Sequence, residues 1–220
     1  MIRIKICGIT NWPDARAACE EGANFIGLNF YKKSPRFVSS AEAGKIRQQL
    51  PKDVEAVGIF VNAKPGDVLS ICSSLRLDAA QLHGDETPQT VADVAESVPV
   101  FKAFRVDPQF SLSTLDKYPG ANTFLLDAAH TGQYGGTGRT TDWALARRAA
   151  LAHRIILAGG LKVENVAAAI RVVRPFAVDV ASGVESKPGK KDHGRLREFI
   201  QEVRRAERQL EEQPEISREP

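Results

Sequence analysis

Short apolar segments recur along the chain, and a turn and a stretch rich in Ala, Glu and Arg follow most of them. In the opening segment Ile2, Ile4 and Ile6 alternate with polar residues, a period of two that predicts a strand. Helix-starting residues such as Ser39 and Thr87 precede the stretches between the apolar segments. The predicted strands are 2–7, 25–30, 56–62, 79–83, 100–105, 123–127, 154–158 and 177–181, and the predicted helices are 13–21, 40–49, 65–74, 88–97, 142–151, 163–173 and 192 to beyond 205, with weaker helical character over 109–117.

Eight strands that alternate with helices predict parallel βα units. The chain has 220 residues, and α/β barrels of about 200–250 residues fold as one unit. Closure into a barrel is therefore favoured over an open sheet. We expect an α/β fold, a single (β/α)8 TIM barrel over residues 1–205, followed by a charged tail over 206–220 that frays.

Composition narrows the class of protein. Hydrophobic residues make up 43% of the chain, charged residues 26%, and the net charge is +3, as in an ordinary globular protein. Acids and bases are interspersed, so nucleic acid is not an expected partner, and no apolar stretch approaches the ~18 residues of a membrane span. Cys7, Cys19 and Cys72 are odd in number and lack metal-like spacing, which predicts a reducing compartment, the cytoplasm, and no metal site.

The alternation within the strands predicts which side chains face the barrel interior. If branched residues take the outer face, polar side chains gather on the inner face, many of them at the last inward position of a strand. In the third strand this assignment places Val57 and Ile59 outside. Such a gathering favours a ligand pocket over a dry core. The predicted inward set is Lys5, Cys7, Asn29, Asn62, Gln81, His83, Arg105, Asp127 and Asp179.

Several of these side chains have both a structural and a chemical interpretation. Most free cysteines are small buried hydrophobes, but Cys7 stands at the C-terminal end of a strand, where barrels place their active sites. Asp127 ends an apolar strand and is either a reactive carboxylate or a structural partner. Asp179 is structural or contacts a ribose. His83 either hydrogen-bonds across the pocket or is a satisfied structural histidine.

The loops carry two further candidates. Arg36 lies in a loop after the second strand, where it is either solvated or placed to bind a carboxylate through its planar fork. Glycines cluster at 135–138, 158–161 and 181–185, each after a strand. One such pair could simply make a tight turn, but two clusters in the last two loops of a barrel favour phosphate binding by backbone amides.

A series of short motifs runs along the chain. The motifs are Lys-Ile-Cys-Gly-Ile-Thr (5–10), Gly-Leu-Asn-Phe (27–30), Ser-Pro-Arg (34–36), Gly-Ile-Phe-Val-Asn (58–62), Gln-Leu-His-Gly (81–84), Leu-Asp (126–127), Gly-Gly-Thr-Gly (135–138), Leu-Ala-Gly-Gly-Leu (157–161) and Ser-Gly-Val-Glu (182–185). Together they resemble phosphoribosylanthranilate isomerases of tryptophan biosynthesis, over residues 1 to about 205 and in the family's order. Ala181 stands where the family more often has Ser.

The resemblance implies an aldose–ketose isomerase that performs an Amadori rearrangement without cofactor or metal. By that resemblance Asp127 is the general acid that opens the sugar ring, Cys7 is the general base that takes the proton from C2, and Arg36 binds the anthranilate carboxylate. The implied partner is a small phosphorylated substrate, and the implied protein is a monomer or homodimer. The remaining implied site residues are His83 and Asp179 for the substrate, and Gly136, Gly159, Gly160, Ser182 and Gly183 for its phosphate.

Two other classes of protein are alternatives to such an isomerase. Another phosphosugar barrel, such as a ribulose-phosphate epimerase or an indole-glycerol-phosphate synthase, needs a metal site or a different set of acids and lysines, which the sequence does not show. A barrel that senses a phosphorylated metabolite would bind its ligand without turnover. Intact Cys7 and Asp127 favour the enzyme.

Overall fold

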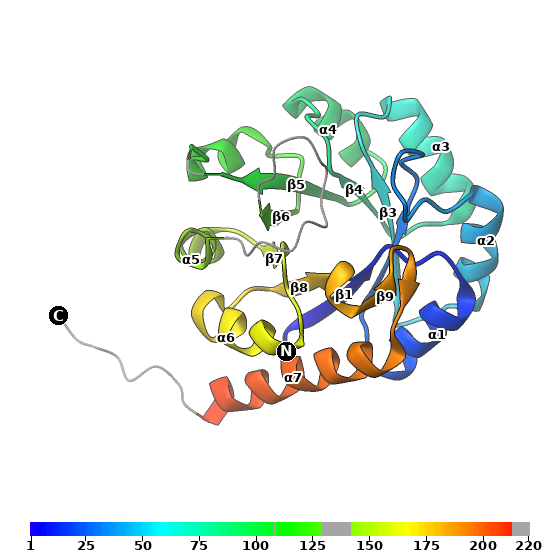
Figure 1. Cartoon of the computed structure of the whole chain (residues 1–220). Coiled ribbons are helices and arrows are strands. Elements are labelled where there is room, and N and C mark those ends of the chain that lie inside the picture. The colour runs from blue at the N-terminus through cyan, green and yellow to red at the C-terminus, as the bar shows by residue number, and fades with distance from the viewer. Residues whose placement is uncertain (108, 129–141, 213–220) are drawn as a thin grey trace.

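The computed structural model describes residues 1–107, 109–128 and 142–212. Within them, parallel strands β1 to β8 close into a barrel in chain order, and the helices surround it (Figure 1). The (β/α)8 prediction is therefore confirmed. The strands are β1 (Arg3–Cys7), β2 (Phe25–Asn29), β3 (Glu55–Phe60), β4 (Ala79–Leu82), β5 (Val100–Val106), β6 (Thr123–Ala128), β7 (Ile155–Leu157) and β8 (Ala177–Val180). The helices are α1 (Trp12–Glu20), α2 (Ser40–Gln49), α3 (Pro65–Leu75), α4 (Pro88–Ala95), α5 (Trp143–Ala152), α6 (Val163–Val173) and α7 (His193–Glu212).

Local chemistry explains where the helices begin. The side chains of Asn11, Ser39, Thr87 and Asp142 each accept a hydrogen bond from a backbone N–H in the first turn of α1, α2, α4 and α5. The weak helical segment after β5 is a short 3₁₀ helix, η1 (Leu112–Lys117). A second 3₁₀ helix, η2 (Ser182–Val184), follows β8 and leads into a small hairpin of β9 (Glu185–Lys187) and β10 (Lys190–Lys191). The sequence pattern did not predict this hairpin.

The core has two parts, separated by the barrel wall. A large apolar cluster lies between the strands and the helices, and a smaller one that includes Phe25, Val57, Phe101 and Leu125 fills the barrel interior. In parallel strands, paired residues point to the same side, so the inner layers can be followed from strand to strand. The cross-strand pairs Lys5↔Phe25 and Lys5↔Asp179 belong to one such layer.

The predicted orientation of the third strand is wrong. Val57 pairs with Gly27 and lies in the interior cluster, whereas Phe60 packs in the outer cluster and stacks on Phe30. The assignment followed side-chain branching, but the space inside the barrel decides. Because Gly27 has no side chain, the neighbouring strand can fill the interior at that level with a branched residue. Asn62 lies beyond the end of β3, in the loop that follows it.

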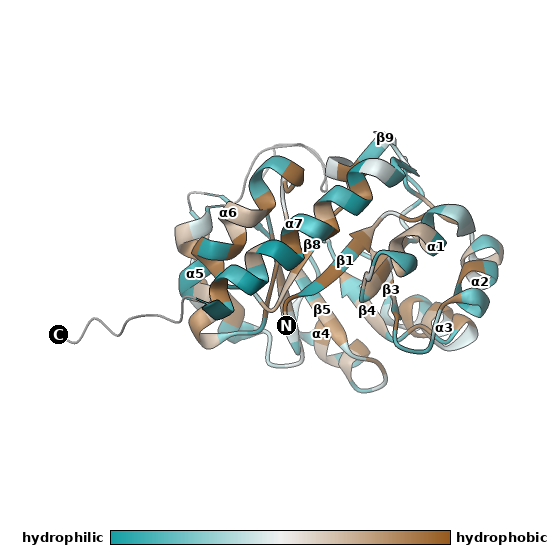
Figure 2. Ribbon diagram, turned by 90° about the horizontal axis from the view of Figure 1, so that it is seen from below, coloured by the Kyte–Doolittle hydropathy of each residue, from teal (hydrophilic) through white to brown (hydrophobic). Residues whose placement is uncertain are grey.

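Helix α7 closes the molecule on the side of β1 and β8. Its apolar face, which includes Phe199 and Val203, is buried and packs against α6 and α1, while Figure 2 shows a largely hydrophilic outer surface. The helix continues to Glu212 with Ala206 buried, so the ordered helix extends beyond the expected boundary at 205. Residues 213–220 of the predicted tail lie outside the described residues. In the described part of the chain, no helix is long and apolar enough to cross a membrane.

Candidate active site

Cys7 ends β1 beside a buried ion pair. Lys5 Nζ lies 2.7 Å from Asp179 Oδ1 on β8, and the Lys5 side chain is fully buried. Burial raises the pKa of the Cys7 thiol, the Asp179 charge adds to that effect, and the Lys5 ammonium partly counters it. Burial alone would lower the pKa of Lys5, but Asp179 and Cys7 outweigh it, so Lys5 stays charged. The partly exposed thiol of Cys7 therefore has a cation beside it.

His83 and Asp127 are neighbours at the barrel mouth. His83 Nε2 lies 3.4 Å from Asp127 Oδ2, without the alignment of a direct hydrogen bond, and both side chains are largely buried. Gln81 Nε2 lies 2.8 Å from His83 Nδ1 and can only donate, so the ring proton of a neutral His83 is on Nε2, toward Asp127. The structure thus brings the predicted acid and the predicted substrate-binding histidine together.

Arg36 reaches the strand tip from the loop after β2. Gly8, at φ +74°, has no side chain where Arg36 crosses: a Cβ there would lie 2.5 Å from Arg36 Cδ. The guanidinium is already paired, since Nε and Nη2 lie 2.9 and 2.7 Å from the two carboxylate oxygens of Glu185. A substrate carboxylate would therefore meet the other edge of the guanidinium, where Nη1 and the second N–H of Nη2 form a second planar fork.

Glu185 and Lys191 are the site residues that sequence reasoning missed. Glu185 was quoted within a motif but given no role, and Lys191 was not singled out. Lys191 Nζ lies 3.0 Å from Glu185 Oε1, and both side chains are buried. Burial would raise the pKa of Glu185, but hydrogen bonds from Arg36 and the charge of Lys191 hold it below its ordinary value. The signal available in the sequence was a carboxylate as the final residue of the last glycine cluster.

The predicted phosphate loops meet after β7 and β8. A Cβ on Gly183 would lie 2.0 Å from the Leu161 carbonyl oxygen, so η2 packs directly against the β7–α6 loop. Gly160, Ser182 and Gly183 line a pocket of about 470 Å³ together with the start of α6 and side chains of α7. Gly159 and Gly160 have φ of +83° and +64°, which favours glycine at both positions. Gly136 lies outside the described residues.

Three other predicted inward residues order their own loops. Asn29 donates to Ser34 Oγ and accepts from the Tyr31 N–H. Asn62 Oδ1 accepts from the Asp85 N–H, and Arg105 forms an ion pair with the Asp85 carboxylate. No group of three or more His, Cys, Asp or Glu side chains among the described residues is arranged to hold a metal ion.

Comparison with known proteins decides the family. The family model described as N-(5'-phosphoribosyl)anthranilate isomerase matches residues 4–202. The chain belongs to the phosphoribosylanthranilate isomerase family. An isomerase of that name from Trichlorobacter lovleyi is 49% identical over 207 residues, which cover 94% of this chain and 100% of the relative. One from Acidithiobacillus ferrooxidans is 47% identical over 93% of this chain and 98% of its own length.

Solved structures of the family have the same fold. The crystal structure of phosphoribosylanthranilate isomerase from Thermotoga maritima superposes with a TM-score of 0.87 at 44% identity, and covers 93% of this chain and 99% of its own. A phosphoribosylanthranilate isomerase in complex with reduced 1-(o-carboxyphenylamino)-1-deoxyribulose 5-phosphate superposes with a TM-score of 0.83 at 41% identity, covering 93% of this chain and 99% of its own. The family predicted from the motifs is therefore confirmed.

Proposed function

We propose that Cys7 and Asp127 catalyse the isomerisation for which this family is named. In that Amadori rearrangement of tryptophan biosynthesis, N-(5-phosphoribosyl)anthranilate becomes 1-(2-carboxyphenylamino)-1-deoxyribulose 5-phosphate. The observation that carries the assignment is the placement of a thiol and a carboxylate at the C-terminal ends of β1 and β6, where a (β/α)8 barrel holds its substrate.

Asp127 acts first, as a general acid. Its proton goes to the ring oxygen of the sugar, the bond from that oxygen to C1 breaks, and the nitrogen lone pair forms a C1=N double bond. Asp127 is buried and its neighbour His83 occupies the same side of the mouth, so the proton is delivered in a site largely shielded from water. The result is an open-chain Schiff base.

Cys7 acts second, as a general base. The thiolate takes the proton from C2, the C2–H electrons form a C1=C2 double bond, and the C1=N electrons move to nitrogen. The resulting enolamine tautomerises to the ketone by losing the proton of its C2 hydroxyl and gaining one at C1. Lys5 lies beside the sulfur and favours the thiolate by its charge.

Binding at both ends of the substrate holds C1 and C2 between these two groups. Arg36 meets the anthranilate carboxylate through its Nη1 edge, and backbone amides near Gly160 and Gly183 bind the phosphate. His83 contacts the sugar next to Asp127. Asp179 serves the substrate indirectly, since it holds Lys5. Anchoring of this kind turns binding free energy into orientation at the reacting atoms.

A direct assay tests the proposal. Phosphoribosylanthranilate generated in situ loses its fluorescence on isomerisation, and the purified protein should accelerate that loss with saturation kinetics. Ligand binding without turnover would instead indicate a sensor and would overturn the assignment.

Two further properties accompany the activity. The protein acts as a monomer or homodimer, and light scattering of the purified chain distinguishes the two; one Thermotoga maritima relative is described as dimeric. We place the reaction in the cytoplasm, because three free cysteines fit a reducing compartment.

A further inference from the structure

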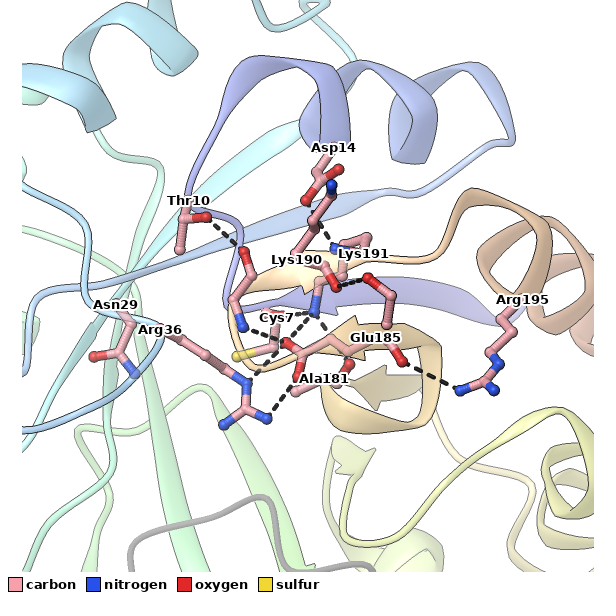
Figure 3. A network of polar contacts seen from close by, with 12 residues as sticks. Cys7, Thr10, Asp14, Asn29, Arg36, Ala181, Glu185, Lys190, Lys191 and Arg195 are labelled. Carbon is pink, nitrogen blue, oxygen red and sulfur yellow. Dashed lines mark hydrogen bonds and ion pairs between the residues drawn. The ribbon is translucent and has the colours of Figure 1, made fainter.

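The hairpin of β9 and β10 holds a buried ammonium against the tips of two barrel strands (Figure 3). Lys191 Nζ lies 2.7 Å from the Cys7 carbonyl oxygen at the end of β1 and 3.1 Å from the Ala181 carbonyl oxygen after β8. Its third contact is Glu185 Oε1, at 3.0 Å. All three N–H groups of the ammonium are thus used, as a buried lysine requires.

Glu185 extends this contact to the substrate side of the site. Its carboxylate accepts from Lys191 and from Arg36, so an unbroken series of polar contacts joins the backbone of Cys7 to the guanidinium of Arg36 (Figure 3). The two ends of the series are the proposed base and the proposed carboxylate-binding group.

The hairpin itself is fastened at two places. The Lys191 N–H lies 2.8 Å from Asp14 Oδ2, and the other oxygen of that carboxylate lies 2.8 Å from His193 Nε2. Thr10 Oγ1 donates to the Gly189 carbonyl oxygen at the hairpin turn, at 2.6 Å. Because it is held by Thr10 in the β1–α1 loop and by Asp14 in the first turn of α1, the hairpin can fix the positions of Glu185 and Lys191.

We propose that Glu185 and Lys191 are a positioning pair that sets where Arg36 lies relative to Cys7. The inference rests on the proposed function. A buried ion pair is seldom needed for stability, since apolar residues of similar size often serve as well. Here Lys191 contacts the backbone of the residue that carries the sulfur, and Glu185 contacts the guanidinium that meets the substrate carboxylate. Their role is therefore to hold the carboxylate-binding edge of Arg36 at a fixed distance from the sulfur.

A first experiment separates positioning from folding. Glu185→Gln keeps the shape of the side chain. It replaces one of the two carboxylate oxygens that accept hydrogen bonds from Arg36 with an NH2 group, which cannot accept. The variant should bind reduced 1-(o-carboxyphenylamino)-1-deoxyribulose 5-phosphate about 10-fold more weakly, since a charged hydrogen bond orients the guanidinium. Binding of the same compound without its carboxylate should be unchanged. Equal weakening of both compounds, or none, would overturn the proposal.

A double-mutant cycle gives a second readout. If Glu185 acts through Arg36, Glu185→Gln should add little to the rise in KM that Arg36→Ala causes alone. Independent effects that simply multiply would contradict the assignment.

Lys191→Met tests the other half of the pair. Loss of the contacts to the strand tips should lower kcat about 10- to 100-fold, because small displacements of a reacting group are costly. The matched control is Lys190→Met, whose side chain is exposed on the same hairpin. Equal kcat values in the two variants would refute the role of Lys191. If Lys191→Met does not fold, the Glu185→Gln measurements still decide.

These outcomes are distinguishable from failure of the proposed function. Turnover by the unsubstituted protein tests the reaction, whereas ligand binding by the variants tests the positioning pair.

Discussion

The proposed chemistry of the site depends on one thiol, Cys7, whose surroundings oppose its ionisation. Burial raises the pKa of Cys7 above its ordinary value of 9.0, and Lys5 counters only part of that effect. A thiolate whose pKa is raised is a stronger base toward a carbon-bound proton. A smaller fraction of the enzyme molecules carries that thiolate at neutral pH. The rate should therefore be sensitive to alkaline pH.

We expect the residual kcat/KM of the Asp127→Asn variant, in which the base alone governs the profile, to rise with pH from about 6 to beyond 9, because the thiolate fraction of the free enzyme increases over that range. Steady-state kinetics in overlapping buffers would measure the profile. The rate of Cys7 alkylation by iodoacetamide, followed by mass spectrometry on the unsubstituted protein, should rise over the same range. An alkylation rate and a variant kcat/KM that are both flat above pH 7 would contradict the assignment of Cys7 as the base.

Cys7→Ser and Asp127→Asn should each lower kcat by about 10²–10⁴-fold, the usual contribution of a general acid or base. Thermal melting should change little, since both substitutions nearly preserve size. Cys19→Ser is the matched control: Cys19 is half-buried on α1, away from the strand ends, and its substitution should leave kcat unchanged. Near-normal turnover by either site variant would refute its assigned role.

At the scale of elements, the sequence pattern predicts the order of strands and helices but not every detail that the site uses. Short apolar runs bounded by turns located the barrel strands, because these parallel strands are buried on both faces. Alternation of side chains misassigned β3, where the space available inside the barrel outweighs branching. The β9–β10 hairpin was not predicted, because β10 has only two residues, Lys190 and Lys191, and neither contributes to a pattern of apolar positions.

In the candidate site, too, some features could be predicted from the sequence and others could not. Cys7, His83, Asp127 and Asp179 were predicted because each stands near the end of a barrel strand, and the topology alone brings those ends together. The pairing of Arg36 with Glu185 could not be predicted, since the two residues are 149 positions apart and meet only through loop conformations. Motifs identify such loops but not which side chains touch.

The two loops proposed to bind phosphate touch each other, and this contact can be tested by substitution. Gly183→Ala would place a methyl group 2.0 Å from the Leu161 carbonyl oxygen, so η2 and the β7–α6 loop must separate. We expect weaker binding of the product or of inorganic phosphate, by about 10-fold or more if one charged hydrogen bond is lost. Isothermal titration calorimetry would measure it.

Gly66→Ala is the control for that substitution. A Cβ at Gly66 meets nothing within 4 Å, and the residue lies in α3, so alanine should be tolerated or slightly stabilising. Equal phosphate affinity in the Gly183→Ala and Gly66→Ala variants would remove the two loops from the binding site.

At the scale of the whole molecule, helix α7 is hydrogen-bonded to the residue that precedes β1. Glu207 on α7 accepts a hydrogen bond from the Ile2 N–H, and Arg204 donates to the Ile2 carbonyl oxygen at 2.7 Å. Strand β1 is thus held by β2 and β8 on its edges and by α7 at its start. Because β1 also carries Cys7, the last helix supports the reactive strand.

Glu207→Ala should lower the free energy of unfolding by about 1–3 kcal/mol, since it leaves a buried backbone N–H without its partner. Glu211→Ala, at an exposed position of the same helix, should change it by less than about 0.5 kcal/mol. Urea denaturation of both variants would measure the difference. Similar unfolding midpoints would show that α7 does not hold the start of the chain.

The series of polar contacts from Cys7 through Lys191 and Glu185 to Arg36 also determines what happens when the chain is cut into two fragments. A cut between β4 and β5 would leave the thiol and the guanidinium on one fragment, and Asp127, Glu185 and Lys191 on the other. Neither fragment alone would possess a working centre. The barrel is therefore suited to a split reporter, in which two proteins fused to the fragments restore growth of a tryptophan auxotroph only when they meet.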